Sequence, residues 1–361
     1  MAAVAPGAGR FQVRRMGPRV SVLTTLFNCR RFIGEAVGSV LGQSLRDLEV
    51  VVCDDGSVDG SAEIVAELAA VDARVRLVRH PVNLGGTAAL RTCVREARGR
   101  YLAVLESDDV ALPGRLARQA EWLDAHPECD AVFGGVQLIG ESGAPLDAAD
   151  PFHGVFAVED RSREEWLRHF FREGNCLCWS SVMYRPEMYG RIGPERPAFQ
   201  FLPDFDLWVR LALDGTFRLL PEPVTAYRRL SGQGNLSAVT PERLAAIAME
   251  QSVILRHFDR PDAMEAVTGL SGGDAAARLA LAREALAVPS QAHRYFAMQV
   301  LLETGVAAMP SGAPDADFLA AARPLLRDAD VFQKLKVARL RAERDKYRER
   351  AEASRRSKQS P

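Results

Sequence analysis

Apolar positions follow two alternating periods along the first 130 or so residues. Short apolar runs, typical of buried strands, alternate with segments whose apolar residues recur at helical spacing. The predicted strands cover 20–26, 48–52, 75–78, 101–105 and 130–133, and the predicted helices cover 32–41, 61–70, 87–97 and 113–125. Strands that alternate with helices of this length are typical of βαβ units. The pattern therefore predicts an α/β fold with a mostly parallel sheet flanked by helices.

The pattern changes in the second half of the chain. Residues 140–160 are loop-like, with several glycines and prolines, and the region after them mixes helices with short strands. The spacing predicts helices over 163–171 and 204–213, an antiparallel strand over 177–184, and two short strands over 217–220 and 224–228. We divide the chain into a disordered N-terminus (1–17), an α/β domain (18–235), a helical C-terminal region (240–330) and a basic helical tail (331–361).

Composition narrows the class of protein. The chain has 361 residues, 47% of them hydrophobic, with a formal net charge of −1, so we expect a large core and no nucleic-acid binding by bulk charge. No apolar run approaches ~20 residues, so we expect neither a membrane span nor a secretion signal. The six cysteines lack the spacing of a disulfide framework or a zinc site, which favours a reducing, cytoplasmic location.

Two acidic segments directly follow predicted buried strands. We call Cys53 to Ser57 the first acidic loop and Glu106 to Asp109 the second acidic loop. Ligands of open α/β sheets bind at the carboxyl ends of the strands, and buried carboxylates are costly unless they face a ligand, a cation or water. The two loops together predict a site for a nucleotide and a divalent cation.

The first acidic loop has two interpretations. Gly56 permits a sharp turn and the next helix needs a cap, so Asp54 and Asp55 could simply belong to a capped turn. Alternatively, at least one of the two carboxylates accepts hydrogen bonds from a base or a ribose. Asn83 and Gly85, after the third strand, suit either a close backbone approach to a ligand or an ordinary turn.

The second acidic loop is harder to explain as a cap, because the predicted helix starts several residues later. Its three acids, Glu106, Asp108 and Asp109, repel one another unless a cation neutralises them. Oxygen-only ligands favour Mg²⁺ or Mn²⁺, which commonly bridge carboxylates to a diphosphate. We therefore predict a metal site here.

The helix predicted from residue 204 carries a further acid. Asp204 shares a stripe with apolar residues and is aimed at the buried side of a helix start, so an N-cap and a general base are both open. Asp206 and Arg210 stand one turn apart, and we expect them to pair at the surface. None of the six histidines forms a ligand-spaced pair, and we expect each on the surface or in a loop.

The order of these motifs closely resembles family 2 glycosyltransferases of the GT-A fold, over about residues 20–230. The matching segments are VSVLTTLFN at 20–28, SVLGQS at 39–44, DDGS at 54–57, Asn83-x-Gly85, SDD at 107–109 and DFDLW at 204–208. The resemblance implies a GT-A domain over 18–235. It also implies an inverting, non-processive transfer of a sugar from a UDP-sugar or another nucleotide-diphosphate sugar, with Mn²⁺ or Mg²⁺.

The resemblance also implies roles for single residues. Asp204 would be the catalytic base, and Asp109, together with Asp108, would hold the metal, with Asp109 the more direct ligand. Residues matching donor-binding positions are Thr25, Asp54, Asp55, Asn83, Gly85, Ser107 and Asp108.

The sequence departs from the family pattern at a few positions. Glu106 stands where the family usually has an aspartate, and Pro203 stands where it commonly has an acid. The family often has a histidine after the position of Tyr227-Arg228, and this chain has none in 229–235. A catalytically inactive nucleotide-sugar-binding module and, less favoured, a nucleotidyltransferase therefore stay as alternatives.

We expect a glycan, lipid-linked or small-molecule hydroxyl acceptor, as in surface polysaccharide synthesis. Peripheral membrane contact and self-association through the C-terminal helices stay open, and neither the sugar nor the acceptor is identified.

Overall fold

The computed structural model describes residues 17–147, 150, 152–230 and 241–304. These residues form an eight-stranded sheet with the strand order β3-β2-β1-β4-β7-β6-β8-β5. The strands are β1 (Val20–Leu26), β2 (Leu48–Asp54), β3 (Val75–Arg79), β4 (Tyr101–Val104), β5 (Val110–Ala111), β6 (Ala131–Ile139), β7 (Met183–Tyr184) and β8 (Phe217–Arg228). The predictions for residues 1–16, for 305–330 of the helical C-terminal region and for the basic tail (331–361) lie outside the described residues.

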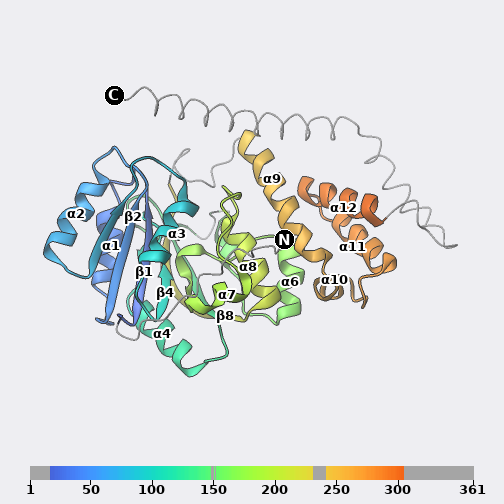
Figure 1. Cartoon of the computed structure of the whole chain (residues 1–361), viewed down its shortest axis with the longest axis horizontal. Helices are drawn as coiled ribbons and strands as arrows, with labels where there is room; N and C mark the ends of the chain where they lie inside the picture. The colour runs from blue at the N-terminus through green and yellow to red at the C-terminus, as the bar shows by residue number, and fades with distance from the viewer. Residues whose placement is uncertain (1–16, 148–149, 151, 231–240, 305–361) are drawn as a thin grey trace, which may run out of the picture. The chain divides into compact units, whose positions relative to one another are not determined.

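The first half of the sheet is parallel, as predicted. Strand β1 pairs in parallel with both β2 and β4, and β2 pairs in parallel with β3. Every residue of β2 is buried, because helices cover both faces of a parallel sheet. Figure 1 shows α1 (Ile33–Leu41) and α2 (Ser61–Val71) to one side of these strands and α3 (Gly86–Glu96) to the other. This arrangement places both acidic loops at the same edge of the sheet.

The second half of the sheet departs from the predictions in three places. The strand predicted over 177–184 is wrong for its first part, where Trp179–Ser181 forms a 3₁₀ turn closed by backbone bonds from Ser181 and Val182, and only Met183–Tyr184 is a strand. The two strands predicted over 217–228 are one, β8, whose prolines fall where its register with Gly134 and Gly135 shifts. The helix predicted from Pro113 begins at Arg115 (α4, Arg115–Ala125).

Helices dominate after β6. They are α5 (His153–Phe156), α6 (Arg163–Arg172), α7 (Tyr189–Ile192), α8 (Pro203–Asp214), α9 (Pro241–Leu255), α10 (Pro261–Thr268), α11 (Ala275–Ala287) and α12 (Gln291–Thr304). One compact unit ends at Gly273 and a second begins at Asp274. The first unit thus includes α9 and α10 and extends beyond the boundary predicted near residue 235. No helix in the described part of the chain combines the length and the apolar character needed to cross a membrane.

Candidate active site

The second acidic loop joins β4 to β5 and carries a buried carboxylate with an unpaired oxygen. Asp109 is 1% exposed, and its Oδ1 accepts a hydrogen bond of 2.9 Å from the backbone amide of Arg228. Its Oδ2 is enclosed and makes no well-aligned hydrogen bond within the described residues, and the nearby Ser180 side chain only partly lowers the pKa of this carboxyl. Burial, followed by the charge of Asp108, raises the pKa of Asp109 well above its usual range. An acidic oxygen in this setting calls for a cation or a proton.

Glu106 connects this loop to the end of β1. The hydroxyl of Thr25 donates to Glu106 Oε2 at 2.8 Å, and the amide of Glu106 donates to Ser180 Oγ at 3.0 Å. Burial raises the pKa of Glu106 to about 7, and the charges of Asp108 and Asp204 contribute in the same direction. Burial likewise raises the pKa of Asp108. The loop therefore concentrates negative charge in a poorly hydrated place.

Asp204 stands in the first turn of α8 and faces the same space. Asn175 Nδ2 donates to Asp204 Oδ2 at 2.8 Å, and the amide of Phe205 donates to Oδ1 at 2.8 Å. Burial raises the pKa of this carboxyl to about 6. Because the charge of Asp204 also raises the pKa of Glu106, the helix and the second acidic loop lie within electrostatic reach of each other. The structure thus brings together residues that are about a hundred positions apart in the sequence.

Asp206 and Arg210 pair as predicted, but the predicted surface location is wrong. Asp206 is 0% exposed and Arg210 is 5% exposed, and two guanidinium nitrogens of Arg210 lie 2.9 and 2.7 Å from Asp206 Oδ2. His257 Nε2 lies 2.9 Å from Asp206 Oδ1. The pair is buried because α8 packs between α6 and α9, which the helical spacing of one segment could not indicate.

The carboxylates of the first acidic loop are occupied by the chain itself. Asp54 ends β2, and its Oδ1 accepts from the amide of Ser57 at 3.1 Å. Asp55 accepts from the amides of Leu84 at 3.0 Å and Gly85 at 2.7 Å, and His80 Nδ1 lies 2.7 Å from its Oδ1. The Asp54 contact lies within the turn, as the turn interpretation expects, whereas Asp55 binds the loop after β3, and α2 begins after Gly60 without a side-chain cap. Ligand roles for Asp54 and Asp55 stay predictions.

The same contacts fix the backbone around the loop. Gly56 has a φ of +80°, and a Cβ at this position would lie 2.9 Å from the amide nitrogen of Asn83. Only glycine therefore allows the first acidic loop to pack against the loop after β3. Asn83 Oδ1 in turn accepts from the amide of Gly85 at 3.1 Å. Both predicted residues of that loop lie beside Asp55.

Arg228, at the end of β8, organises the second acidic loop and was not singled out from the sequence. Its Nε donates to the carbonyl of Asp108 at 2.7 Å, and one terminal nitrogen lies 2.6 Å from Glu35 Oε2 on α1. Its guanidinium also lies 4.6 Å from the ring centre of Phe32. The guanidinium therefore supports the loop backbone and pairs with Glu35, and its charge also lowers the pKa of Asp108 against the effect of burial.

Sequence reasoning also missed Asn175, Ser180 and His80. The Asn175 side chain contacts Asp204, and the Ser180 hydroxyl contacts the amide of Glu106. Both contacts join segments that are far apart in the sequence. The prediction of a surface or loop position holds for His80, which lies in the loop after β3, although its side chain is only 11% exposed. It is wrong for His293, which lies in α12 and is 1% exposed. The close contact between Ser107 and the Cys29 thiol was not anticipated either.

The fit of a divalent cation can be judged from these contacts. Among the described residues, no group of three His, Cys, Asp or Glu side chains is arranged to hold a metal ion. Two neighbouring carboxylates, one with an unpaired buried oxygen, are nevertheless what Mg²⁺ or Mn²⁺ uses when a diphosphate supplies further ligands. The residues fit a cation that is shared with a donor rather than one caged by protein alone.

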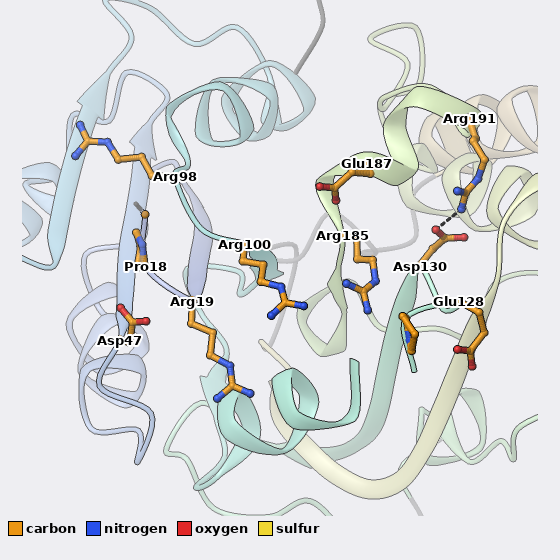
Figure 2. Close-up of a pocket in the computed structure, with 12 residues that line it drawn as sticks. Pro18, Arg19, Asp47, Arg98, Arg100, Glu128, Asp130, Arg185, Glu187 and Arg191 are labelled. Atoms are coloured by element: carbon orange, nitrogen blue, oxygen red, sulfur yellow. Dashed lines mark ion pairs between the residues drawn. The ribbon is translucent and has the colours of Figure 1, made fainter. Parts of the chain in front are cut away.

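A cavity of about 770 Å³ lies elsewhere, at the amino ends of the strands. Figure 2 shows arginines and acids around it, including Arg19, Arg100, Arg185 and Arg191. Arg19 and Arg100 both pair with Asp124, and Arg191 pairs with Asp130. This cavity therefore lies at the end of the sheet opposite the acidic loops, and several of its charged side chains are already paired, so we do not assign it to the candidate active site.

Comparison with known proteins identifies the class. The family described as "Glycosyl transferase family 2" matches residues 21–189. EpsE of Bacillus subtilis (strain 168), provisionally named a glycosyltransferase, is 30% identical over 205 residues, which cover 55% of this chain and 68% of EpsE. TuaG of the same organism, provisionally named a teichuronic acid biosynthesis glycosyltransferase, is 31% identical over 198 residues, covering 55% and 73%.

Solved structures agree on the fold. TarS of S. aureus in complex with UDP-GlcNAc superposes with a TM-score of 0.52 and 15% sequence identity, covering 78% of this chain and 84% of that chain. The fold is therefore the predicted GT-A fold. The chain belongs to glycosyltransferase family 2 and is a glycosyltransferase, as the resemblance implied.

Proposed function

We propose that the protein transfers a sugar from a nucleotide-diphosphate donor to an acceptor hydroxyl, with inversion at the anomeric carbon and with a divalent cation. One observation carries the proposal. Buried Glu106 lies within electrostatic reach of both Asp108 and Asp204, from two distant segments, and Asp109 has an enclosed oxygen without a hydrogen-bond partner among the described residues. Family membership supports the reaction class, and the carboxylates support the way it is performed.

The donor would lie across both acidic loops. Thr25, Asp54, Asp55, Asn83 and Gly85 would surround the base and ribose, and Ser107 and Asp108 would lie at the ribose and diphosphate. In the absence of donor, Asp55 holds the amides of Leu84 and Gly85. This contact keeps the base-side loops in place before binding. Because TarS was crystallised with UDP-GlcNAc, UDP-sugars are the first donors to test.

Of the two predicted metal ligands, Asp108 is the more accessible. Asp108 is half-buried, whereas Asp109 has one oxygen on the Arg228 amide and the other enclosed. We therefore assign the metal to both carboxylates: Asp108 would contact it from the accessible side, and Asp109, the more direct ligand implied by the resemblance, would contact it through its unpaired Oδ2. A bound Mn²⁺ or Mg²⁺ offsets the negative charge that grows on the leaving diphosphate.

Asp204 would act as the base. The acceptor oxygen attacks the anomeric carbon, the bond from that carbon to the diphosphate oxygen breaks, and the hydroxyl proton passes to Asp204. A carboxyl with a pKa of about 6 is ionised at neutral pH and is a stronger base than an ordinary aspartate. Asn175 holds one oxygen of this carboxylate and so orients it. A single displacement inverts the anomeric centre.

The acceptor class is proposed from the relatives. The name of TuaG refers to teichuronic acid biosynthesis, which supports a polysaccharide or its precursor as the acceptor of this chain. The base needs an acceptor that carries a hydroxyl group, and a free or lipid-linked glycan supplies one.

The test is a donor and acceptor screen on the full chain. UDP-, GDP- and dTDP-sugars are incubated with glycan acceptors in Mn²⁺, in Mg²⁺ and in EDTA. We expect metal-dependent release of the nucleoside diphosphate and a product of inverted anomeric configuration by NMR. Retained configuration would contradict the mechanism. Binding without release would favour the inactive module, and release of pyrophosphate from a nucleoside triphosphate and a sugar phosphate would favour a nucleotidyltransferase.

A further inference from the structure

Helix α9 supplies a carboxylate to the segment that leads into the base. Glu250 Oε1 accepts from the amide of Gln200 at 2.7 Å, and Oε2 accepts from the amides of Phe201 at 2.9 Å and Leu202 at 2.8 Å. Leu202 is the N-cap residue of α8, and its side chain forms no capping bond. One side chain thus takes up three consecutive backbone donors just before Asp204.

These bonds are of a strong kind. A carboxylate that accepts from amide N–H groups forms charge-assisted bonds, and its charge lies next to the positive end of the α8 dipole. The amides of residues 200–202 precede α8, so no carbonyl of the helix accepts from them. The direction in which α8 starts, and with it the position of the Asp204 side chain, depends on this contact.

The same stretch of chain holds α8 at two other points. His257, just after α9, lies 2.9 Å from Asp206 Oδ1. At the other end of α8, Arg260, just before α10, lies 2.7 Å from Asp214 Oδ2. The family match ends at residue 189, before any of these contacts.

We propose that Glu250 is a positioning residue for the base, and that α9 belongs to the catalytic machinery rather than to a separate appendage. The inference rests on the proposed role of Asp204. Glu250 does not reach the reacting atoms through any contact described here. It acts by fixing residues 200–202 and so the first turn of α8.

The charges around Asp204 support a direct electrostatic influence as well. The Phe205 amide and Asn175 lower its pKa against the effect of burial, and the charge of Glu250 raises it. Glu106 faces Asp204 from the second acidic loop. Removing the charge of Glu250 should therefore lower the pKa of Asp204. A substitution that only destabilises the fold at a distant position should leave this pKa unchanged.

The experiment compares Glu250→Gln and Glu250→Ala in the full chain with Glu67→Gln, an exposed glutamate on α2, as the matched control. Hydrogen exchange at the amides of 200–202, the titration of Asp204 by ¹³C NMR, and kcat and donor KM are measured. We expect faster exchange at 200–202 and a lower Asp204 pKa. We also expect kcat to fall roughly 10- to 100-fold in Glu250→Ala, with donor KM within about twofold and Glu250→Gln intermediate.

The outcomes distinguish the role of Glu250 from the proposed function. Unchanged exchange at 200–202, or a kcat for Glu250→Ala equal to that of Glu67→Gln, would overturn the role of Glu250. If Glu250→Ala does not fold, Glu250→Gln decides by the same criteria. If the wild-type protein transfers no sugar, the proposed function fails, and the exchange and NMR measurements still decide whether Glu250 positions Asp204.

Discussion

The two acidic loops look alike in sequence and differ in the structure. Each places carboxylates directly after a buried strand. In the first acidic loop the carboxylates of Asp54 and Asp55 accept hydrogen bonds from the amides of Ser57, Leu84 and Gly85. In the second, Asp108 and Asp109 have raised pKa values and Asp109 keeps an unpaired oxygen. The same motif can thus build a loop or hold charge ready for a ligand, and the hydrogen-bond partners distinguish the two.

The largest effect is expected at Asp204, the fourth carboxylate, which the fold places near the three acids of the second acidic loop. Asp204→Asn keeps the shape and can accept from either Asn175 or the Phe205 amide, but it removes the base, so kcat should fall roughly 10²–10⁴-fold. Donor binding, measured by calorimetry, should change little. Wild-type kcat in this variant would exclude Asp204 as the base.

Asp108→Asn should show that donor binding depends on metal through the second acidic loop and not through the first. We expect Mn²⁺ to stop enhancing donor binding and kcat to fall roughly 10²-fold, since charge stabilisation on the diphosphate is lost. Titration of a UDP-sugar with Mn²⁺ and with EDTA measures this. Asp55→Asn serves as the comparison and should retain the metal response. Equal metal enhancement in both variants would remove the distinction drawn here.

Asp55→Asn should instead reduce stability. An asparagine can accept from one amide but presents an N–H₂ group toward the other donor, which leaves a buried group unpaired. We expect the free energy of unfolding to fall by about 2–3 kcal/mol, measured by urea denaturation. A variant as stable as the wild type would mean that Asp55 does not hold the loop after β3.

Glu106→Gln should raise stability, with an effect that depends on pH. A carboxyl whose pKa is about 7 when folded and near 4.5 when unfolded makes the protein progressively less stable as pH rises between these values. At pH 8 the variant should exceed the wild type by roughly 1–3 kcal/mol, and at pH 4.5 the two should converge. Urea denaturation at both pH values measures this. A constant difference would show that Glu106 is not desolvated as described.

The smallest effect is the pH dependence of the wild-type rate. Because the base must be ionised, kcat should fall about tenfold per pH unit below a pH of about 6, where Asp204 becomes protonated. A pH–rate profile at saturating donor and metal tests this. A limb at the ordinary aspartate value near 4 would mean that the bound donor restores an ordinary environment to Asp204.

Much of the fold could be predicted from local pattern. Strand β1 and the starts of β2 and α2 agree with their predicted residues, because buried runs and amphipathic helices leave a periodic signal. The antiparallel strand predicted over 177–184 is confirmed only at Met183–Tyr184, since Trp179–Ser181 forms a 3₁₀ turn. The surface prediction for the Asp206–Arg210 pair failed because neighbouring helices bury a face that α8 alone would expose.

The sequence by itself determined the class of enzyme, the two acidic loops and the aspartate at the start of α8. These rest on residue type and spacing, which need no knowledge of contacts. Only the tertiary structure decided which carboxylates are occupied, that Arg228 braces the second acidic loop, and that Glu250 caps the segment before Asp204. Such roles come from side chains that meet across long sequence separations, and burial and hydrogen bonding, not residue identity, set their charge and their chemistry.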